Sequence, residues 1–179
     1  MNEGYTEIRI PAHLKAKQPE PVRILVISDT HGDTAVYQRI LLKCPSFDIA
    51  AHLGDCVYDV KPLKRLIGDV PLLNVRGNCD PFFSGIGERT VEVAGVRILL
   101  VHGHEDHVHD DLLNLYYHAL EQNAGCVFYG HTHRSSVDRT GNVWMVNPGS
   151  PSRPRAGQKP SFAVLEIRDG KCYPSIVTI

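Results

Sequence analysis

Side chains that can bind divalent metal ions recur in five short blocks of this sequence, and nearly every block directly follows a hydrophobic run typical of a β-strand. Carboxylate and imidazole groups, with one amide oxygen, form a mixed oxygen and nitrogen donor set. Such a set suits Mn, Fe, Zn or Ni better than Ca or a thiolate zinc site. Because the donors outnumber what one ion ordinarily takes from a protein, they predict a two-metal centre, the arrangement that activates water and neutralises phosphate charge in phosphoester hydrolysis. The donors are Asp29, His31, Asp55, Asn78, His102, His131 and His133.

Each donor has a more ordinary explanation when it is taken alone. Asp29 could cap the helix that follows it, and Asp55 or Asn78 could simply occupy a turn beside glycine. A lone histidine in a turn is usually structural or solvated. The joint presence of the five blocks favours metal binding, because the strands of an α/β sheet carry sites at their carboxyl ends.

The order and spacing of the blocks resemble the calcineurin-like metallophosphoesterase superfamily, specifically its compact single-domain phosphodiesterase branch, over residues 22–179. The sequence Asn147-Pro148-Gly149-Ser150 is also similar to that branch, where it closes the site after the last metal-binding loop. The resemblance implies two divalent metal ions bridged by Asp55, with Mn expected first and Ni, Fe, Zn or Mg as alternatives. The implied ligands are Asp29, His31, Asp55 and His133 for one ion, and Asp55, Asn78, His102 and His131 for the other.

The implied mechanism is attack on phosphorus by a hydroxide held between the two cations. Asn78 would keep the negative charge of the site low enough to accept an anionic phosphate. Many family members carry histidine after this asparagine as a candidate acid for the leaving group, whereas here Cys79 stands there, followed by Asp80. The proton donor therefore stays open between His104, Asp80 and a metal-bound water. Cys79 is expected to be a buried packing residue.

Three cations, Arg153, Arg155 and Lys159, lie just beyond residue 150. Arginine binds phosphate oxygens in a bidentate manner, so Arg153 or Arg155 is a candidate to hold the substrate. A solvated surface loop explains the same residues about equally well.

The first half of the chain alternates strands with amphipathic stretches, the βαβ pattern of a largely parallel sheet. Two hairpins are predicted in the second half, at Gly141-Asn142 and at Asp169-Gly170, so that half is expected to be mostly antiparallel. Residues 110–123 have helical spacing, with Asp110 or Asp111 as the cap. Together with the resemblance, this order predicts an α/β fold: a four-layer α-β-β-α sandwich of two mixed sheets flanked by helices. The predicted strands are 22–28, 48–53, 71–75, 89–95, 96–101, 126–129, 135–140, 143–147, 161–167 and 172–179, and the first two helices are 34–44 and 59–68.

Bulk properties place the chain among ordinary globular domains. It has 179 residues, of which 42% are hydrophobic and 22% charged, enough for one domain with a sizeable core. The formal net charge of -1 offers no global positive field, so nucleic acid is not an expected partner. Five cysteines without a CxxC pair indicate reduced thiols in the cytoplasm and no disulfides.

No apolar run is long enough for a signal peptide or a membrane helix, so no membrane association is expected. Residues 1–21, with Pro19 and Pro21, are interpreted as an extension that precedes the domain at 22–179. A homo-oligomer is left open.

Two other functions compete with a phosphoesterase acting on a small phosphoester. The segment from His102 to His107 spells H-x-H-x-D-H, the ligand signature of metallo-β-lactamase-like zinc hydrolases. That hypothesis leaves four of the donors without roles, namely Asp29, His31, Asp55 and Asn78. The fold also occurs as a protein-binding scaffold, a subunit of the retromer coat with a degraded metal site. Because every expected ligand is present here, catalysis is the favoured function, while the sequence leaves the substrate open among nucleotide, cyclic nucleotide and phospholipid-derived esters.

Overall fold

The computed structural model describes residues 21–179, which form two five-stranded sheets and three α-helices. Of the predicted extension, only Pro21 lies within the described residues. The strands are β1 (Val22–Ile27), β2 (Ile49–His52), β3 (Leu72–Asn74), β4 (Glu88–Val93), β5 (Val96–Val101), β6 (Cys126–Phe128), β7 (Ser136–Thr140), β8 (Val143–Asn147), β9 (Ser161–Arg168) and β10 (Lys171–Thr178). The α-helices are α1 (Val36–Lys43), α2 (Val60–Ile67) and α3 (Leu113–Glu121), and the short 3-10 helices are η2 (Val57–Asp59) and η3 (Phe82–Ser84).

The first sheet has the strand order β10-β9-β1-β2-β3, and the second has the order β4-β5-β6-β8-β7. Strands β1, β2 and β3 are parallel, as the βαβ pattern predicts. Both predicted hairpins form, as β7 with β8 and β9 with β10. The second half is mostly antiparallel, as expected, but at the centre of the second sheet β5, β6 and β8 run parallel. Local turn signals reveal hairpins, but they do not reveal which distant strand a hairpin joins.

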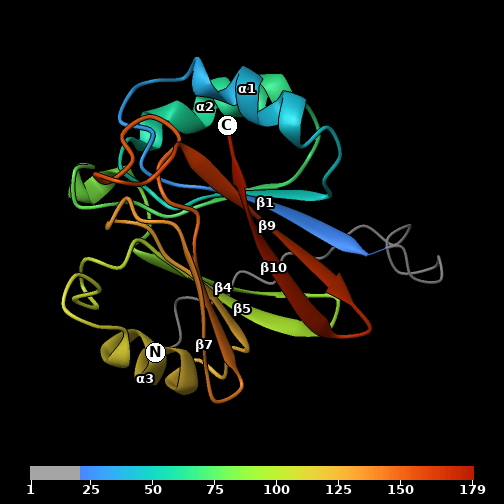
Figure 1. Ribbon diagram of the computed structural model, residues 1–179, viewed down its shortest axis with the longest axis vertical. Coiled ribbons are helices and arrows are strands. Elements are labelled where there is room, and N and C mark those ends of the chain that lie inside the picture. Colours follow the sequence, from blue (N-terminus) through green and yellow to red (C-terminus); the bar gives the residue numbers. More distant parts are fainter. Residues whose placement is uncertain (1–20) are drawn as a thin grey trace.

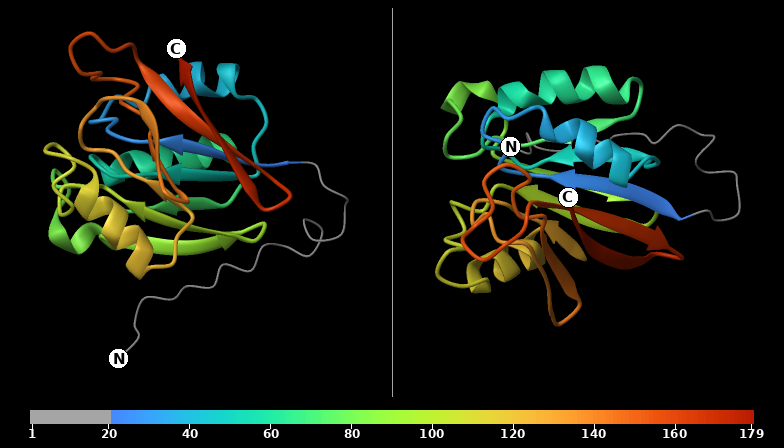
Figure 2. Two further views of the ribbon diagram at one scale, coloured as in Figure 1. Left: turned by 60° about the horizontal axis from the view of Figure 1, so that its bottom comes forward. Right: turned by 45° about the horizontal axis from the view of Figure 1, so that its top comes forward.

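The two sheets pack face to face, with helices outside both, and this confirms the four-layer sandwich (Figure 1 and Figure 2). Alternation along β1 shows how the layers are built. Ile24 and Val26 face the second sheet in the central core, which also contains Ile98 and Leu100 of β5. Leu25, between them in sequence, faces the outer core under the helices.

Two helices cover the first sheet and one covers the second (Figure 1). Ile40 of α1 and Leu63 of α2 pack in one outer core, and Leu115 of α3 packs in the other. Helix α3 is shorter than its predicted range at both ends. Asp111 does help to start it, because its Oδ1 accepts a hydrogen bond from the N–H of Leu113 at 2.8 Å.

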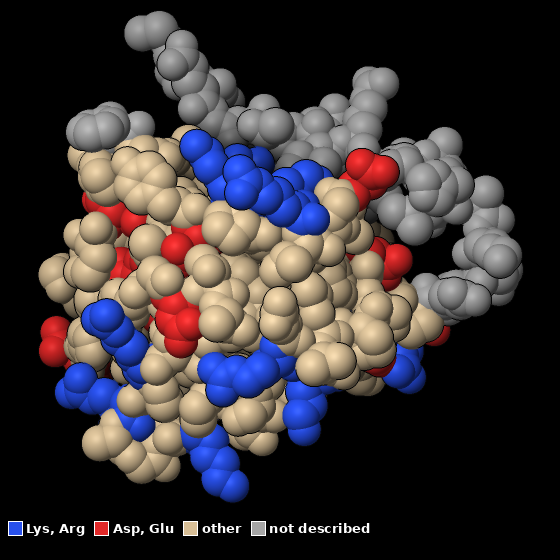
Figure 3. All heavy atoms as spheres, turned by 90° about the horizontal axis from the view of Figure 1, so that it is seen from above, with Lys and Arg blue, Asp and Glu red and all other residues tan. Residues whose placement is uncertain are grey.

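The surface over α1 and α2 carries Lys and Arg in several separate groups, with Asp and Glu between them (Figure 3). This distribution agrees with the near-neutral net charge of -1. Among residues 21–179, none of the helices is both long and apolar enough to cross a membrane.

Candidate metal centre

The predicted donors lie in loops at the carboxyl ends of strands from both sheets. Asp29 and His31 follow β1, Asp55 follows β2, and Asn78 follows β3. The second sheet contributes His102 directly after β5, and His131 and His133 from the loop after β6. Backbone hydrogen bonds join these loops: the N–H of Asp29 donates to the carbonyl of Gly54 at 3.1 Å, and the N–H of His31 donates to that of Asp55 at 3.1 Å.

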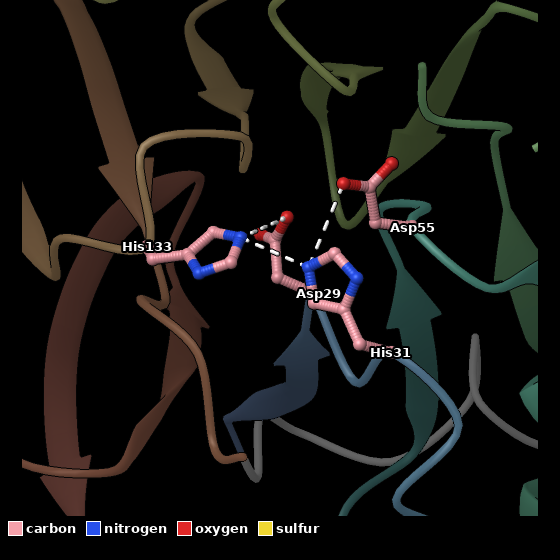
Figure 4. A group of neighbouring side chains, drawn as sticks. All are labelled: Asp29, His31, Asp55 and His133. Atoms are coloured by element: carbon pink, nitrogen blue, oxygen red, sulfur yellow. Dashed lines mark hydrogen bonds and ion pairs between the residues drawn. The ribbon is translucent and has the colours of Figure 1, made fainter. Parts of the chain in front are cut away.

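Four of the donors form one compact group, Asp29, His31, Asp55 and His133, with one ligand atom from each within 4.8 Å of all the others (Figure 4). The Nε2 atoms of His31 and His133 lie 3.0 Å apart. Nε2 of His133 lies 3.4 Å from Oδ1 of Asp29, and Nε2 of His31 lies 3.7 Å from Oδ2 of Asp55. Side chains from three separate loops therefore point at one small volume, and they are the set that the resemblance implies for one ion.

A second group lies on the other side of Asp55. Nε2 of His102 is 3.0 Å from Oδ1 of Asn78 and 3.3 Å from Oδ1 of Asp55. The ring of His131 packs edge-on against His102, with 5.2 Å between the ring centroids. Asp55 thus turns one carboxylate oxygen toward each group, which is the geometry that a bridging ligand needs.

Hydrogen bonds on the far side of two imidazoles fix which nitrogen faces the site. Nδ1 of His102 donates to the carbonyl of Leu53 at 2.7 Å, and Nδ1 of His133 donates to the carbonyl of Arg153 at 2.6 Å. Each ring then presents Nε2 to the centre with its lone pair available. Metal-binding histidines are typically oriented in this way.

The electrostatics keep two histidines neutral. Burial lowers the pKa of His31, although the charges of Asp55 and Asp29 oppose it. Burial, together with the charges of His102 and His109, lowers the pKa of His131 to about 4. Neutral imidazole is the form that binds metal, so these two rings need release no proton when an ion enters near neutral pH.

Asp29 is buried, and burial by itself would raise its pKa, but the neighbouring His133 and the charge of His102 hold the pKa below the usual value. Its Oδ1 is buried without a hydrogen-bond partner. A buried carboxylate oxygen in this state is costly unless a cation compensates it. The orphaned oxygen and the converging nitrogens fit divalent metal ions well.

Two glycines are required by close packing of the loops. A Cβ on Gly77 would lie 2.6 Å from the backbone nitrogen of Asp55, and one on Gly130 would lie 2.7 Å from Oδ2 of Asp29. These distances leave no room for a side chain. Glycine therefore precedes Asn78 and His131 because the loops that carry the donors touch there.

A buried polar network that no sequence pattern indicated supports the loops from behind. The hydroxyl of Thr30 donates to Oδ2 of Asp59 at 2.7 Å, and the N–H of Gly32 donates to the same oxygen at 2.9 Å. His52 lies 3.1 Å from that hydroxyl, and its Nδ1 accepts from the N–H of Gly54 at 3.3 Å. The only available signal was that polar His52 and Asp59 stand among apolar neighbours.

The segment 147–150 holds the loop that carries His131 and His133. Nδ2 of Asn147 donates to the carbonyl of Gly130 at 2.8 Å. The hydroxyl of Ser150 donates to the carbonyl of Asp29 at 2.8 Å, and that of Ser152 donates to the carbonyl of Thr30 at 2.9 Å. These bonds connect the loop after β8 to the loop after β1.

The structure corrects the expected role of Cys79, which is exposed rather than buried in the core. Partial burial of the thiol and the neighbouring Asp55 raise its pKa to about 11, so it is protonated at neutral pH. The N–H of Cys79 donates to Oδ1 of Asp55 at 3.0 Å. Its backbone, rather than its side chain, therefore serves the site.

Asp80 is committed to three backbone donors. Its Oδ1 accepts from the N–H groups of Cys56 at 3.0 Å and Val57 at 2.7 Å, and its Oδ2 accepts from that of Gly77 at 2.8 Å. A proton on this carboxylate would displace one of these bonds. Among the two protein acids considered from the sequence, the geometry therefore favours His104, whose ring centroid lies 5.4 Å from that of His102.

Arg153 and Arg155 reach the site through their backbones. The carbonyl of Arg153 accepts from His133, and the N–H of Arg155 donates to the carbonyl of His133 at 3.0 Å. Both side chains are exposed. Their binding of substrate stays a prediction.

The residues of the H-x-H-x-D-H segment are divided between two places. His102 lies in the centre, but Asp106 turns away and contacts Nδ1 of His118 on α3 at 2.8 Å. His107 is exposed. The segment therefore does not assemble the zinc site of the competing hypothesis.

Comparison with known proteins gives consistent relatives. Probable metallophosphoesterase YsnB of Bacillus subtilis (strain 168) is 32% identical over 151 residues, which cover 83% of this chain and 86% of the relative. The crystal structure of a conserved protein from Streptococcus pneumoniae TIGR4, described as a predicted phosphoesterase, has 27% identity and a TM-score of 0.76, covering 90% of this chain and 91% of that one. Wild-type Vps29 of Entamoeba histolytica complexed with Zn2+ shares the fold at 21% identity, with a TM-score of 0.68 and coverage of 88% and 99%.

The model of the calcineurin-like phosphoesterase superfamily domain matches residues 22–170. That range contains both donor groups and all five blocks from which the metal centre was predicted. The chain belongs to the calcineurin-like phosphoesterase superfamily.

Proposed function

We propose that this protein is a phosphodiesterase with a two-metal centre that hydrolyses a small phosphoester. The observation that carries the proposal is the position of Asp55, whose two carboxylate oxygens face two different sets of donors. One set would be Asp29, His31, Asp55 and His133, and the other would be Asp55, Asn78, His102 and His131. Mn is the metal we expect first, because the donors are oxygen and nitrogen without thiolate.

Bound divalent ions would supply a hydroxide nucleophile at neutral pH and neutralise charge on the phosphate. The chain's own residues prepare the site for this chemistry. Leu53 and Arg153 orient the rings of His102 and His133 through their carbonyls. Asn78 adds an oxygen without adding charge, so the centre stays attractive to an anionic ester. His104 is our candidate for the group that gives a proton to the departing oxygen.

Removal and restoration of metal tests the proposal directly. After EDTA treatment and gel filtration, hydrolysis of bis(p-nitrophenyl) phosphate should be abolished, and added Mn should restore it. Asp55→Asn should reduce the Mn-dependent rate by about 100-fold or more, because it weakens both sites at once. Asp110→Asn, a change of an exposed aspartate beyond the centre, is the matched control and should retain the rate. Full activity in a preparation verified to be metal-free would contradict the proposal.

The competing scaffold function requires a measurement of turnover rather than of binding. A Vps29 of the same fold was crystallised with Zn2+, so metal binding alone does not separate a scaffold from an enzyme. Mn-stimulated turnover that depends on Asp55 would favour catalysis. Metal binding without turnover across phosphodiesters and phosphomonoesters would favour the scaffold.

The five free thiols support the cytoplasm as the compartment.

A further inference from the structure

An exposed aromatic ring stands in the segment between β3 and β4, the same segment that carries Asn78. Phe82 begins the short helix η3, and 81% of its surface is accessible to solvent. It follows Asn78, a proposed ligand, by only four residues. The exposed ring offers a planar apolar surface, and an aromatic ring near a binding site is a natural contact for substrate.

The backbone that carries Phe82 is held firmly. Asp80, two residues earlier, accepts two backbone hydrogen bonds from the loop after β2, those of Cys56 and Val57, and a third from Gly77 within its own segment. Two residues after Phe82, the hydroxyl and the backbone N–H of Ser84 both donate hydrogen bonds to the carbonyl of Pro81, at 2.6 and 2.8 Å. The ring is thus presented on a fixed turn, so a ligand that binds it would lose little free energy in ordering the loop.

One face of the ring is occupied by Arg76. The guanidinium carbon lies 4.6 Å from the centroid of Phe82, a cation–π contact. Only 13% of the Arg76 side chain is exposed, and its ion pair with Glu105 spans 3.7 Å to a carboxylate that is itself 69% exposed. Such a long, solvent-screened pair neutralises the guanidinium incompletely. The positive charge of Arg76 therefore favours an anionic group nearby.

Contacts lead from this pair into the centre. The carboxylate of Glu105 that meets Arg76 also lies 3.6 Å from Nε2 of His104. The His104 ring packs 5.4 Å from His102, a proposed ligand. Arg76 is thus joined through Glu105 to His104, the candidate proton donor, and the ring of Phe82 packs on Arg76.

We propose that Phe82 and Arg76 form an aromatic subsite that binds the planar ring of the phosphoester's organic group. The open face of Phe82 would stack on that ring, and Arg76 would hold Phe82 in place while attracting the anionic ester. The proposal deepens the function given above and rests on it. The substrate class is then a phosphoester whose organic group is aromatic, either an aryl group or a nucleobase.

Binding of phosphonates that are not hydrolysed tests the subsite without relying on turnover. Calorimetry on the Mn-loaded protein should show that phenylphosphonate binds more tightly than cyclohexylphosphonate, which has similar size but no π-system. Phe82→Ala should reduce this preference by about three- to tenfold, the size expected for one aromatic pair. Phe82→Trp should restore it. Tyr173→Ala is the matched control, because Tyr173 is an exposed ring of β10 that lies 5.6 Å from the Arg168 guanidinium.

A second pair of ligands distinguishes the two sources of an aromatic ring. If Phe82→Ala also weakens the binding of adenosine 5′-monophosphate but not that of ribose 5-phosphate, the subsite reaches a nucleobase. If it weakens the binding of phenylphosphonate alone, the aromatic ring of the ligand must stand close to phosphorus, as in an aryl ester. An unchanged preference in both pairs would overturn the proposal.

The same variants separate this subsite from the other hypotheses. Loss of a dimer in Phe82→Ala, measured by light scattering, with both ligand preferences intact would identify the ring as a contact between protein chains and overturn the subsite. Phosphonate selectivity that depends on Phe82 without hydrolysis of any ester would leave the subsite standing and contradict the phosphodiesterase. Hydrolysis whose rate and selectivity do not change when Phe82 is replaced would support the phosphodiesterase and contradict the subsite.

Discussion

At the scale of single residues, most of the proposed ligands adopt a left-handed backbone conformation, which is unfavourable for residues that have a side chain. A left-handed conformation costs a residue other than glycine about 1–2 kcal/mol. The ligands concerned are Asp29 (φ 57), His31 (φ 47), Asp55 (φ 54), His131 (φ 68) and His133 (φ 55). Bonds from Ser150, Asn147 and Cys79 to these loops hold the conformation in place. We interpret the strain as the consequence of turning several side chains from separate strands toward one point.

The proposed acid gives the first prediction at this scale. General acid catalysis usually contributes about 10²- to 10⁴-fold, and it matters most when the leaving oxygen is strongly basic. His104→Ala should therefore slow a methyl or ethyl ester at least tenfold more than a p-nitrophenyl ester, which needs little protonation. The measurement is kcat for both ester types in the Mn-loaded enzyme. His107→Ala, an exposed histidine of the same loop, is the control and should leave the ratio unchanged. An equal loss on both esters would assign the proton to a metal-bound water.

The sequence predicted which residues meet, because a residue just after a buried strand must lie at the edge of its sheet. It did not predict how they are held. Asp80 precedes a proline in a turn-rich stretch, and nothing local indicates that its carboxylate accepts bonds from the distant Cys56 and Val57. The burial of Cys79 was predicted wrongly because side-chain polarity says little about a residue in a loop. Thr30 and His52 acquire their roles only from tertiary contacts.

At the scale of elements, the hydrophobic periods predicted the helices, the hairpins and the parallel strands β1, β2 and β3, because each depends on local pattern. The order of the second sheet depends on long-range pairing of β6 with β5 and β8, which no local period encodes. Local pattern was equally insufficient for Asp106, which fitted a metal-binding signature by its spacing alone. In the fold it connects the loop after β5 to α3.

That connection predicts a pH-dependent stability. His118 of α3 lies between two carboxylates, with Nδ1 at 2.8 Å from Asp106 of the loop and Nε2 at 3.0 Å from Glu88 of β4. Both nitrogens can donate only in the protonated ring. The hydrogen bond to Asp106 raises the pKa of His118, burial opposes the rise, and the charges of Asp106 and Glu88 add to it.

Because the folded-state pKa is raised, the stabilisation is complete below the unfolded pKa of about 6.5 and is lost as pH rises through the folded value. The free energy of unfolding of the wild type should therefore exceed that of His118→Gln by about 1–2 kcal/mol near pH 6, and the difference should shrink toward pH 9. Urea titrations in EDTA at several pH values measure it. His107→Gln serves as the control, and a difference that stays constant with pH would show that His118 contributes packing rather than charge.

At the scale of the whole molecule, the proposed ligands divide between the two sheets. Asp29, Asp55 and Asn78 follow strands of the first sheet, whereas His102 and His131 follow strands of the second. Ions bound among them would therefore join the sheets at the open edge of the sandwich. Elsewhere the sheets are held together by apolar contacts of the central core. Metal binding should then stabilise the molecule as a unit rather than one loop.

Thermal unfolding tests this coupling. At an ion concentration 100 times the dissociation constant, binding to the folded state adds about 2.7 kcal/mol, which for a domain of this size raises the melting temperature by about 5 to 10 °C. Asp55→Asn should lose most of the shift, since Asp55 faces both donor groups, and Asp110→Asn should keep it. Hydrogen exchange should slow at the ends of both β2 and β5 when Mn is added. Protection confined to one sheet would contradict a centre shared by the two. An undiminished shift of the melting temperature in Asp55→Asn would place the stabilising ion at other histidines. A centre that bridges the sheets through Asp55 cannot lose that carboxylate and still bind both ions with full affinity.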